Sequence, residues 1–111
     1  MTCSVYDLVL IPFPYADLSS SKRRPVLVLA APDRHGDFIA LAVTTVPQLE
    51  PAIPLNSVDI VDGILPKPSW IRVDKVFTLS DQNIVKHIGK IKPECMVKEL
   101  KSLCRIVGYA K

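Results

Sequence analysis

The chain has 111 residues, of which 49% are hydrophobic and 23% are charged. That length suits one small domain over residues 1–111, and the apolar content excludes an intrinsically disordered chain. The formal net charge of +3 favours an anionic partner only weakly and excludes a histone-like excess of positive charge.

Three cysteines, Cys3, Cys95 and Cys104, are widely separated and odd in number. This pattern argues against a disulfide framework and against a zinc site, and it fits a reducing cytoplasm. We expect each cysteine to be a small core residue. The first apolar run is broken by two prolines, so we expect neither a signal peptide nor a membrane span.

The first predicted strand covers residues 5–11, which are dense in β-formers. Pro12 and Pro14 end it, because proline donates no amide hydrogen to a strand ladder. Residues 26–31 form an unbroken apolar run, which predicts a strand that is buried on both faces. The turn-rich residues 32–36 then lead into a third strand. In all we expect strands over residues 5–11, 26–31, 38–45, 55–60, 70–79 and 89–91, with another beginning at 64–65.

Two helical segments are predicted late in the chain. Ser80 and Asp81 can cap a short helix through Lys86, and Pro93 suits the first turn of a longer helix that ends near Gly108. Short strands, long loops and no βαβ alternation predict an α+β domain, a small, strongly bent antiparallel barrel with a C-terminal amphipathic helix. The apolar stripe of that helix is predicted to serve core or dimer packing: Met96, Val97, Leu100, Leu103, Cys104 and Val107, with Lys98, Glu99, Lys101 and Arg105 between them.

Polar residues at three predicted strand ends could handle phosphate. Residues 22–25 read Lys-Arg-Arg-Pro, and the planar guanidinium of Arg24 matches a phosphate. The proline that follows restricts Arg24 to extended geometry. Thr44 and Thr45 close the third strand and offer hydroxyls to a phosphate oxygen.

The alternation over residues 70–79 puts Trp70, Arg72 and Asp74 on one strand face. The arginine and the aspartate form either a structural ion pair or an acid, base and charge-stabilising set, and the indole either stacks on a base or fills core. His35 and His87 lie far apart without metal-ligand spacing, so we expect both at the surface and no metal site. Phosphate-loop, dinucleotide-binding and nucleophile-elbow motifs do not occur.

Two stretches resemble a known family. Residues 6–15, YDLVLIPFPY, with Asp17-Leu18 and residues 22–29, KRRPVLVL, are similar to the opening strand, first loop and second strand of the MazF/PemK toxins of bacterial toxin–antitoxin pairs. Residues 43–45, VTT, and 70–79, WIRVDKVFTL, resemble two later strands of that family. The resemblance spans nearly the whole chain.

The resemblance implies an SH3-like barrel, a homodimer and a cytoplasmic, metal-independent endoribonuclease that cuts single-stranded RNA without a cofactor. It also implies growth inhibition and a small antitoxin partner with an acidic C-terminal segment. The candidate catalytic residues are Arg24, Thr44, Arg72 and Asp74. The candidate RNA-binding residues are Lys22, Arg23, Thr45, Trp70 and Lys75.

Our hypothesis for the reaction is attack by the RNA's own 2′-hydroxyl on the adjacent phosphorus. Two features depart from the family pattern: Asp74 is followed by Lys-Val-Phe, where many members have Gln and then Arg, and residues 12–24 contain no histidine. We expect residues 19–21 to form a loop tip that gates the groove. Two other functions remain open, a non-enzymatic inhibitor like the related gyrase poisons and an SH3-like module that binds nucleic acid without cutting it.

Overall fold

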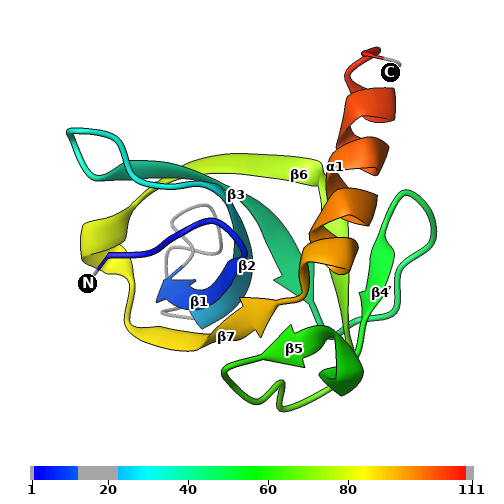
Figure 1. The fold of residues 1–111 in the computed structure, drawn as a ribbon, viewed down its shortest axis with the longest axis horizontal. Helices are drawn as coiled ribbons and strands as arrows, with labels where there is room; N and C mark the ends of the chain where they lie inside the picture. Colours follow the sequence, from blue (N-terminus) through cyan, green and yellow to red (C-terminus); the bar gives the residue numbers. More distant parts are fainter. Residues whose placement is uncertain (1, 13–22, 110–111) are drawn as a thin grey trace.

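The computed structural model describes residues 2–12 and 23–109. In this part of the chain seven strands form one antiparallel sheet in the order β4-β6-β3-β2-β1-β7-β5, which curls into an open barrel beside a C-terminal helix (Figure 1). The predicted fold class is therefore confirmed. The elements are β1 (Asp7–Pro12), β2 (Arg23–Ala30), β3 (Asp37–Thr44), β4 (Ile53–Leu55), the 3-10 turn η1 (Ser57–Asp59), β5 (Ile60–Val61), β6 (Ser69–Ser80), η2 (Asp81–Asn83), β7 (Lys86–Ile91) and α1 (Pro93–Ile106).

The curl of the sheet comes from irregular pairing along its long strands. Between the pairs Arg72–Ala42 and Val76–Leu41, β6 has three residues without a partner in β3. Register shifts also occur between β1 and β7 and between β2 and β3. Such insertions bend and twist a strand. As a result β6 pairs with β3 along most of its length and with β4 near its start.

Two hydrophobic cores occupy the two faces of this sheet. One is centred on Leu8, Leu27 and Leu41 and includes Met96 of α1. The other is centred on Val9, Val26 and Phe38, inside the curl. Neighbouring residues of β1 and β2 therefore contribute to opposite cores, which confirms the prediction that residues 26–31 form a strand buried on both faces in its central part.

The segment between residues 53 and 65 differs from the prediction. Instead of one edge strand over residues 55–60, the chain forms β4, turns through η1, and continues as the two-residue β5. The turn is fixed because the backbone amide of Asn56 donates to Asp59 Oδ2 at 2.8 Å and the Asp59 amide donates to the Asn56 carbonyl at 2.9 Å. Residues 64–65 form no strand, although Leu65 is buried.

The predicted helix from Ser80 to Lys86 is also wrong. The Ser80 hydroxyl accepts from the Gln82 amide at 3.3 Å, but η2 ends at Asn83. The chain then pairs with β1. The Val85 amide donates to the Leu10 carbonyl at 2.9 Å, and Lys86 pairs with Leu10. Strand β7 is accordingly longer than the predicted residues 89–91.

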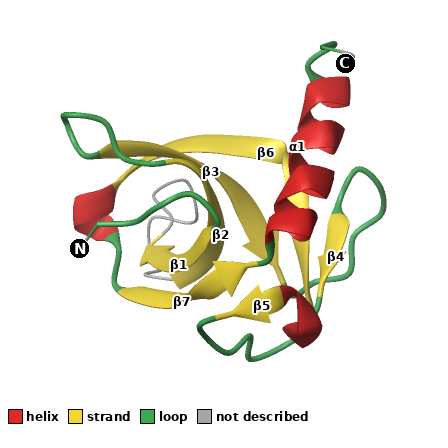
Figure 2. Cartoon of the chain, in the orientation of Figure 1, coloured by secondary structure: helices red, strands yellow, loops and turns green. Residues whose placement is uncertain are grey.

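The C-terminal helix is confirmed, and the predicted stripe is buried in part, since Met96 lies in the core and Leu103 packs against it. Pro93 stands in the first turn, and Gly108 follows the helix with a φ of 83°, a backbone conformation that favours glycine. The buried residues are Met96, Glu99 and Ser102, whereas Val97 and Leu100 are 49% and 42% exposed. Figure 2 shows α1 lying to one side of the curled sheet, close to β4.

The cysteines are free thiols. Cys3 belongs to the core inside the curl, while Cys95 packs against the other core from a half-buried position and Cys104 is half-buried. Within residues 2–12 and 23–109, no helix is long and apolar enough to cross a membrane.

Candidate ribonuclease site

Arg24 lies inside β2 rather than before it, because the strand begins at Arg23. Arg23 pairs with Pro12 of β1, Arg24 pairs with Ile11, and both arginines are exposed. The backbone of Arg24 is thus fixed by the β1 ladder, and the proline that follows it reinforces the extended conformation. The side chain leaves a rigid strand and is open to solvent.

Thr44 is the last residue of β3 and pairs with Trp70 of β6. Its Oγ1 accepts a hydrogen bond from the Val46 amide at 3.1 Å. A hydroxyl has one donor and two acceptor positions, so this bond fixes the oxygen while leaving the O–H able to donate. Thr45 follows the strand end and is exposed.

The pairing pattern places four of the predicted residues on one face of the sheet. Ala42 pairs with both Val26 of β2 and Arg72 of β6, and directly opposed residues project to the same side. Alternate residues of a strand share a face. Arg24 therefore lies on the face of Val26, Thr44 on that of Ala42, and Trp70 on that of Arg72, which is one and the same face.

This face is apolar at one end of the strands and polar at the other. At one end its residues Val26, Val28, Phe38 and Ala40 belong to the core inside the curl. At the other end the same face carries Arg24, Thr44, Trp70 and Arg72, of which Arg24 is exposed and the other three are half-buried. Two guanidinium groups, a hydroxyl and an indole therefore lie at the open end of the curl, a combination that suits a phosphate next to a base.

Asp74 and Lys75 lie in the three-residue stretch of β6 that has no partner in β3. Both are exposed. The predicted alternation holds up to Val73 but changes face across this stretch, because Ile71 and Val73 lie in one core and Leu79 in the other. No ion pair joins Arg72 to Asp74 in the part of the chain that the structure describes. The structural ion pair that the sequence left open is therefore not formed here.

Some predicted features lie outside the described residues. Lys22 and the candidate loop tip at residues 19–21 lie beyond the described residues. The described neighbours of that segment, Pro12 and Arg23, pair with each other. Pro12 and Arg23 therefore both lie next to Arg24 in the β1–β2 ladder.

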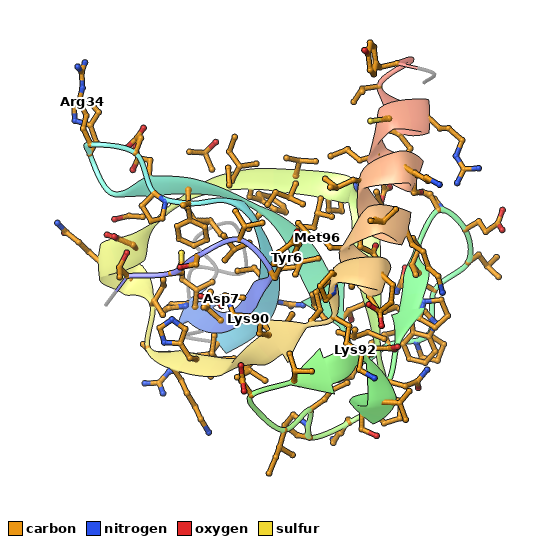
Figure 3. The ribbon with its side chains drawn as sticks, in the orientation of Figure 1. Tyr6, Asp7, Arg34, Lys90, Lys92 and Met96 are labelled. Atoms are coloured by element: carbon orange, nitrogen blue, oxygen red, sulfur yellow. The ribbon has the colours of Figure 1, made fainter. Side chains whose placement is uncertain are left out.

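An ionic cluster that sequence reasoning missed joins β1 to β7. Asp7 is only 8% exposed, and Lys90 Nζ donates to its Oδ1 at 2.6 Å; Figure 3 shows the two residues close together. Asp7 Oδ2 accepts from the Ser4 amide at 2.8 Å and lies 3.8 Å from His87 Nε2. The signal in the sequence was an aspartate directly preceding a buried apolar run.

The two histidines are exposed, as predicted. His35 accepts a hydrogen bond from Arg34 Nε at 3.2 Å, at the tip of the β2–β3 hairpin where Figure 3 labels Arg34. Across residues 2–12 and 23–109, no group of three or more His, Cys, Asp or Glu side chains could hold a metal ion.

Comparisons with known proteins agree with this architecture. The model of the PemK-like, MazF-like toxin of type II toxin–antitoxin systems matches residues 4–107. No curated protein sequence matches the chain significantly.

Several solved structures share the fold. An endoribonuclease in complex with its cognate antitoxin from a mycobacterial species is 18% identical with a TM-score of 0.77, covering 98% of each chain. A MazE–MazF structure from Deinococcus radiodurans is 17% identical with a TM-score of 0.76, covering 99% of each chain. The Mycobacterium tuberculosis toxin MazF-mt6 is 18% identical with a TM-score of 0.70, covering 95% of this chain and 99% of that one. With the family model matching nearly its whole length, the chain belongs to the PemK/MazF family of type II toxin–antitoxin toxins.

Proposed function

We propose that this toxin is a sequence-selective, metal-independent endoribonuclease that cleaves single-stranded RNA. The observation that carries the proposal is the placement of Arg24, Thr44, Trp70 and Arg72 on one face of three adjacent strands, at the open end of the curl. A phosphodiester on this face meets positive charge from two strands and a hydroxyl from the strand between them. The endoribonuclease structure with the same fold supports the reaction class.

In the proposed reaction the RNA 2′-hydroxyl loses its proton to Asp74 and its oxygen bonds to the adjacent phosphorus, while the bond from phosphorus to the 5′-oxygen breaks and that oxygen takes a proton from water. The products are a 2′,3′-cyclic phosphate and a free 5′-hydroxyl. Arg24 stabilises the negative charge that develops on the phosphorane oxygens, and the Thr44 hydroxyl donates to one of them. Because the pKa of an arginine lies above about 12, Arg24 is assigned charge stabilisation rather than proton donation.

Arg72 and Asp74 take separate roles in this proposal. Since no ion pair holds Asp74 to Arg72 in the described residues, Arg72 contributes its charge directly to the RNA backbone. Asp74 is exposed on the unpaired stretch of β6 and serves as the general base once RNA is bound. Trp70, half-buried beside Thr44, offers its exposed edge to a base.

The remaining RNA contacts are ionic, apart from that of the Thr45 hydroxyl. Lys22, Arg23, Thr45 and Lys75 complete the proposed RNA-binding set, and the three described members of that set are exposed. Contacts of this kind make the affinity for RNA fall as salt rises.

We also propose two protein partners for this chain in the cytoplasm. An antitoxin with an acidic segment would cover the cationic face formed by Arg24 and Arg72, as complementary charge favours. A second copy of the chain would cover the outer side of α1, where Val97 and Leu100 are exposed one turn apart. Exposed apolar residues grouped on one helix side are typical of protein interfaces.

The test is cleavage of a single-stranded RNA in the presence of a chelator, comparing the wild type with Arg24→Ala. Losing the main charge-stabilising donor is expected to lower the cleavage rate by about 10²–10³-fold. Arg34→Ala is the matched control, because Arg34 is an exposed arginine at the far hairpin tip and its loss should leave the rate unchanged.

Three outcomes would overturn parts of the proposal. A 5′-phosphate product excludes attack by the 2′-hydroxyl. Binding of RNA without cleavage indicates an SH3-like nucleic-acid-binding module instead. A protein that neither binds nor cuts RNA, yet inhibits growth, indicates an inhibitor like the gyrase poisons.

A further inference from the structure

A cavity of about 270 Å³ lies between β4, η1 and α1, away from the Arg24 face. Figure 1 shows α1 and β4 side by side, with the η1 turn below them. The cavity has one apolar wall from β4 and one polar wall from η1 and α1. Its lining residues are Ile53, Pro54, Leu55, Asn56, Asp59, Cys95, Lys98 and Glu99.

Glu99 is the unusual member of this lining. It is 1% exposed, and its Oε2 atom is buried without a hydrogen-bond partner. Desolvation raises the pKa of its carboxyl to about 8, with Lys98 opposing the rise and Asp59 adding to it. A buried, unsatisfied carboxyl oxygen is costly to a fold, so its presence at the edge of a cavity needs a reason.

The acidic neighbour across the cavity is already bonded. Asp59 Oδ2 accepts from the Asn56 amide at 2.8 Å, and Oδ1 accepts from Cys95 Sγ at 3.3 Å. Burial raises the pKa of the Cys95 thiol to about 11, so the thiol keeps its proton and remains a donor. What the cavity lacks is a donor for Glu99 Oε2.

The charges around the cavity favour a cationic donor. The titratable groups facing Glu99 are Asp59 from η1 and Cys95 and Lys98 from α1, while β4 supplies Ile53, Pro54 and Leu55 and no titratable group. With Glu99 neutral, Asp59 and Lys98 cancel in formal charge. An added cation would therefore be compensated by one further carboxylate, which only Glu99 can supply.

A metal ion does not fit this requirement. Asp59, Cys95 and Glu99 are not arranged to hold one, since the described part of the chain contains no metal-ligating group of three. The apolar wall instead suits an alkyl stem.

We propose that this cavity binds a small organic cation with a primary ammonium head, whose N–H groups donate to Glu99 Oε2 and whose alkyl stem packs on Ile53, Pro54 and Leu55. On binding, the Glu99 O–H bond breaks, its proton leaves to the buffer, and a carboxylate–ammonium pair forms. The proposal is independent of RNA cleavage, because none of the lining residues is assigned to catalysis or RNA binding; Pro54 only pairs with Trp70 at the β4–β6 edge.

The test uses n-propylammonium chloride with the full chain at neutral pH, and tetramethylammonium chloride at equal ionic strength as a cation without N–H donors. At about ten times the dissociation constant, the amine is expected to raise the folded-to-unfolded ratio about tenfold in chemical denaturation. Calorimetry in buffers of different ionisation heat should show release of about one proton per amine bound. Tetramethylammonium should neither stabilise the fold nor cause proton release.

Glu99→Gln removes the carboxylate and should abolish both the stabilisation and the proton release. Glu94→Gln, an exposed site on the same helix, is the matched control and should retain both. Equal stabilisation by the two cations, or an unchanged amine effect in Glu99→Gln, overturns the proposal. A carbon-13 spectrum that shows Glu99 already ionised at neutral pH without amine also overturns the proposal. If that ionisation depends on protein concentration, the donor to Glu99 comes from a second copy of the chain.

Discussion

Replacing Glu99 with glutamine should change how the stability of the fold depends on pH. In the folded chain the Glu99 carboxyl has its pKa raised from an ordinary 4.5 to about 8 by desolvation. An acid whose folded pKa is raised stabilises the fold fully below the unfolded value, and this stability is lost as pH rises toward the folded value. The wild type should therefore lose stability between pH 4.5 and about 8.

The size of the loss follows from the two pKa values. At about 1.4 kcal/mol per pH unit, the interval from 4.5 to about 8 corresponds to a maximum on the order of 4–5 kcal/mol, of which about 3 is already lost at pH 7. A domain of this size is stable by about 5–15 kcal/mol, so the effect is large. Glutamine has nearly the same shape and no charge, and it should not show this loss.

The assay is urea denaturation of both proteins at several pH values from 4.5 to 8.5. Subtracting one curve from the other isolates Glu99, because all other titrating groups are shared. We expect similar stability at the acidic end and a growing advantage for Glu99→Gln toward the alkaline end. Parallel curves across the range would refute the reasoning, and Glu94→Gln should run parallel to the wild type.

Three further predictions concern other parts of the molecule. Asp7→Asn weakens the bond between the nearly buried Asp7 carboxylate and the partly exposed Lys90 and should destabilise the fold by about 1–3 kcal/mol, measured by urea denaturation at pH 7. Gly63→Ala should destabilise the fold by at least about 1–3 kcal/mol, because its Cβ would lie 2.1 Å from the backbone oxygen of Ile88; an unchanged urea midpoint would contradict this. Thr44→Val should lower the RNA cleavage rate at least about tenfold while leaving the circular dichroism spectrum unchanged.

Much of the fold could be predicted from local patterns. The unbroken apolar run of β2 indicated burial on both faces, and the structure places Leu27 in one core and Val26 and Val28 in the other. The shared face of Trp70 and Arg72 followed from the two-residue period of a strand. These predictions succeed because each depends only on residues adjacent along the chain.

The predictions that failed depend on partners distant in sequence. Ser80 carries a helix-capping signal, yet the chain pairs with β1 from Lys86 onward. Glu99 lies outside the predicted apolar stripe of α1, yet it is buried and lines a cavity together with η1 and β4. The unpaired stretch of β6 around Asp74 is likewise set by the register of that strand with β3, which no local pattern records.

The register of β6 with β3 affects the proposed chemistry. Arg24, Thr44 and Arg72 each pair with a neighbouring strand, so the ladder fixes the positions from which their side chains project. Asp74 has no such partner in β3 and forms no ion pair within the described residues. In the proposed reaction the sheet would therefore preorganise charge stabilisation, whereas the proposed base would be positioned only when RNA binds. Substitutions at Arg24 should therefore lower the cleavage rate for every RNA alike, while substitutions at Asp74 should affect some RNA sequences more than others.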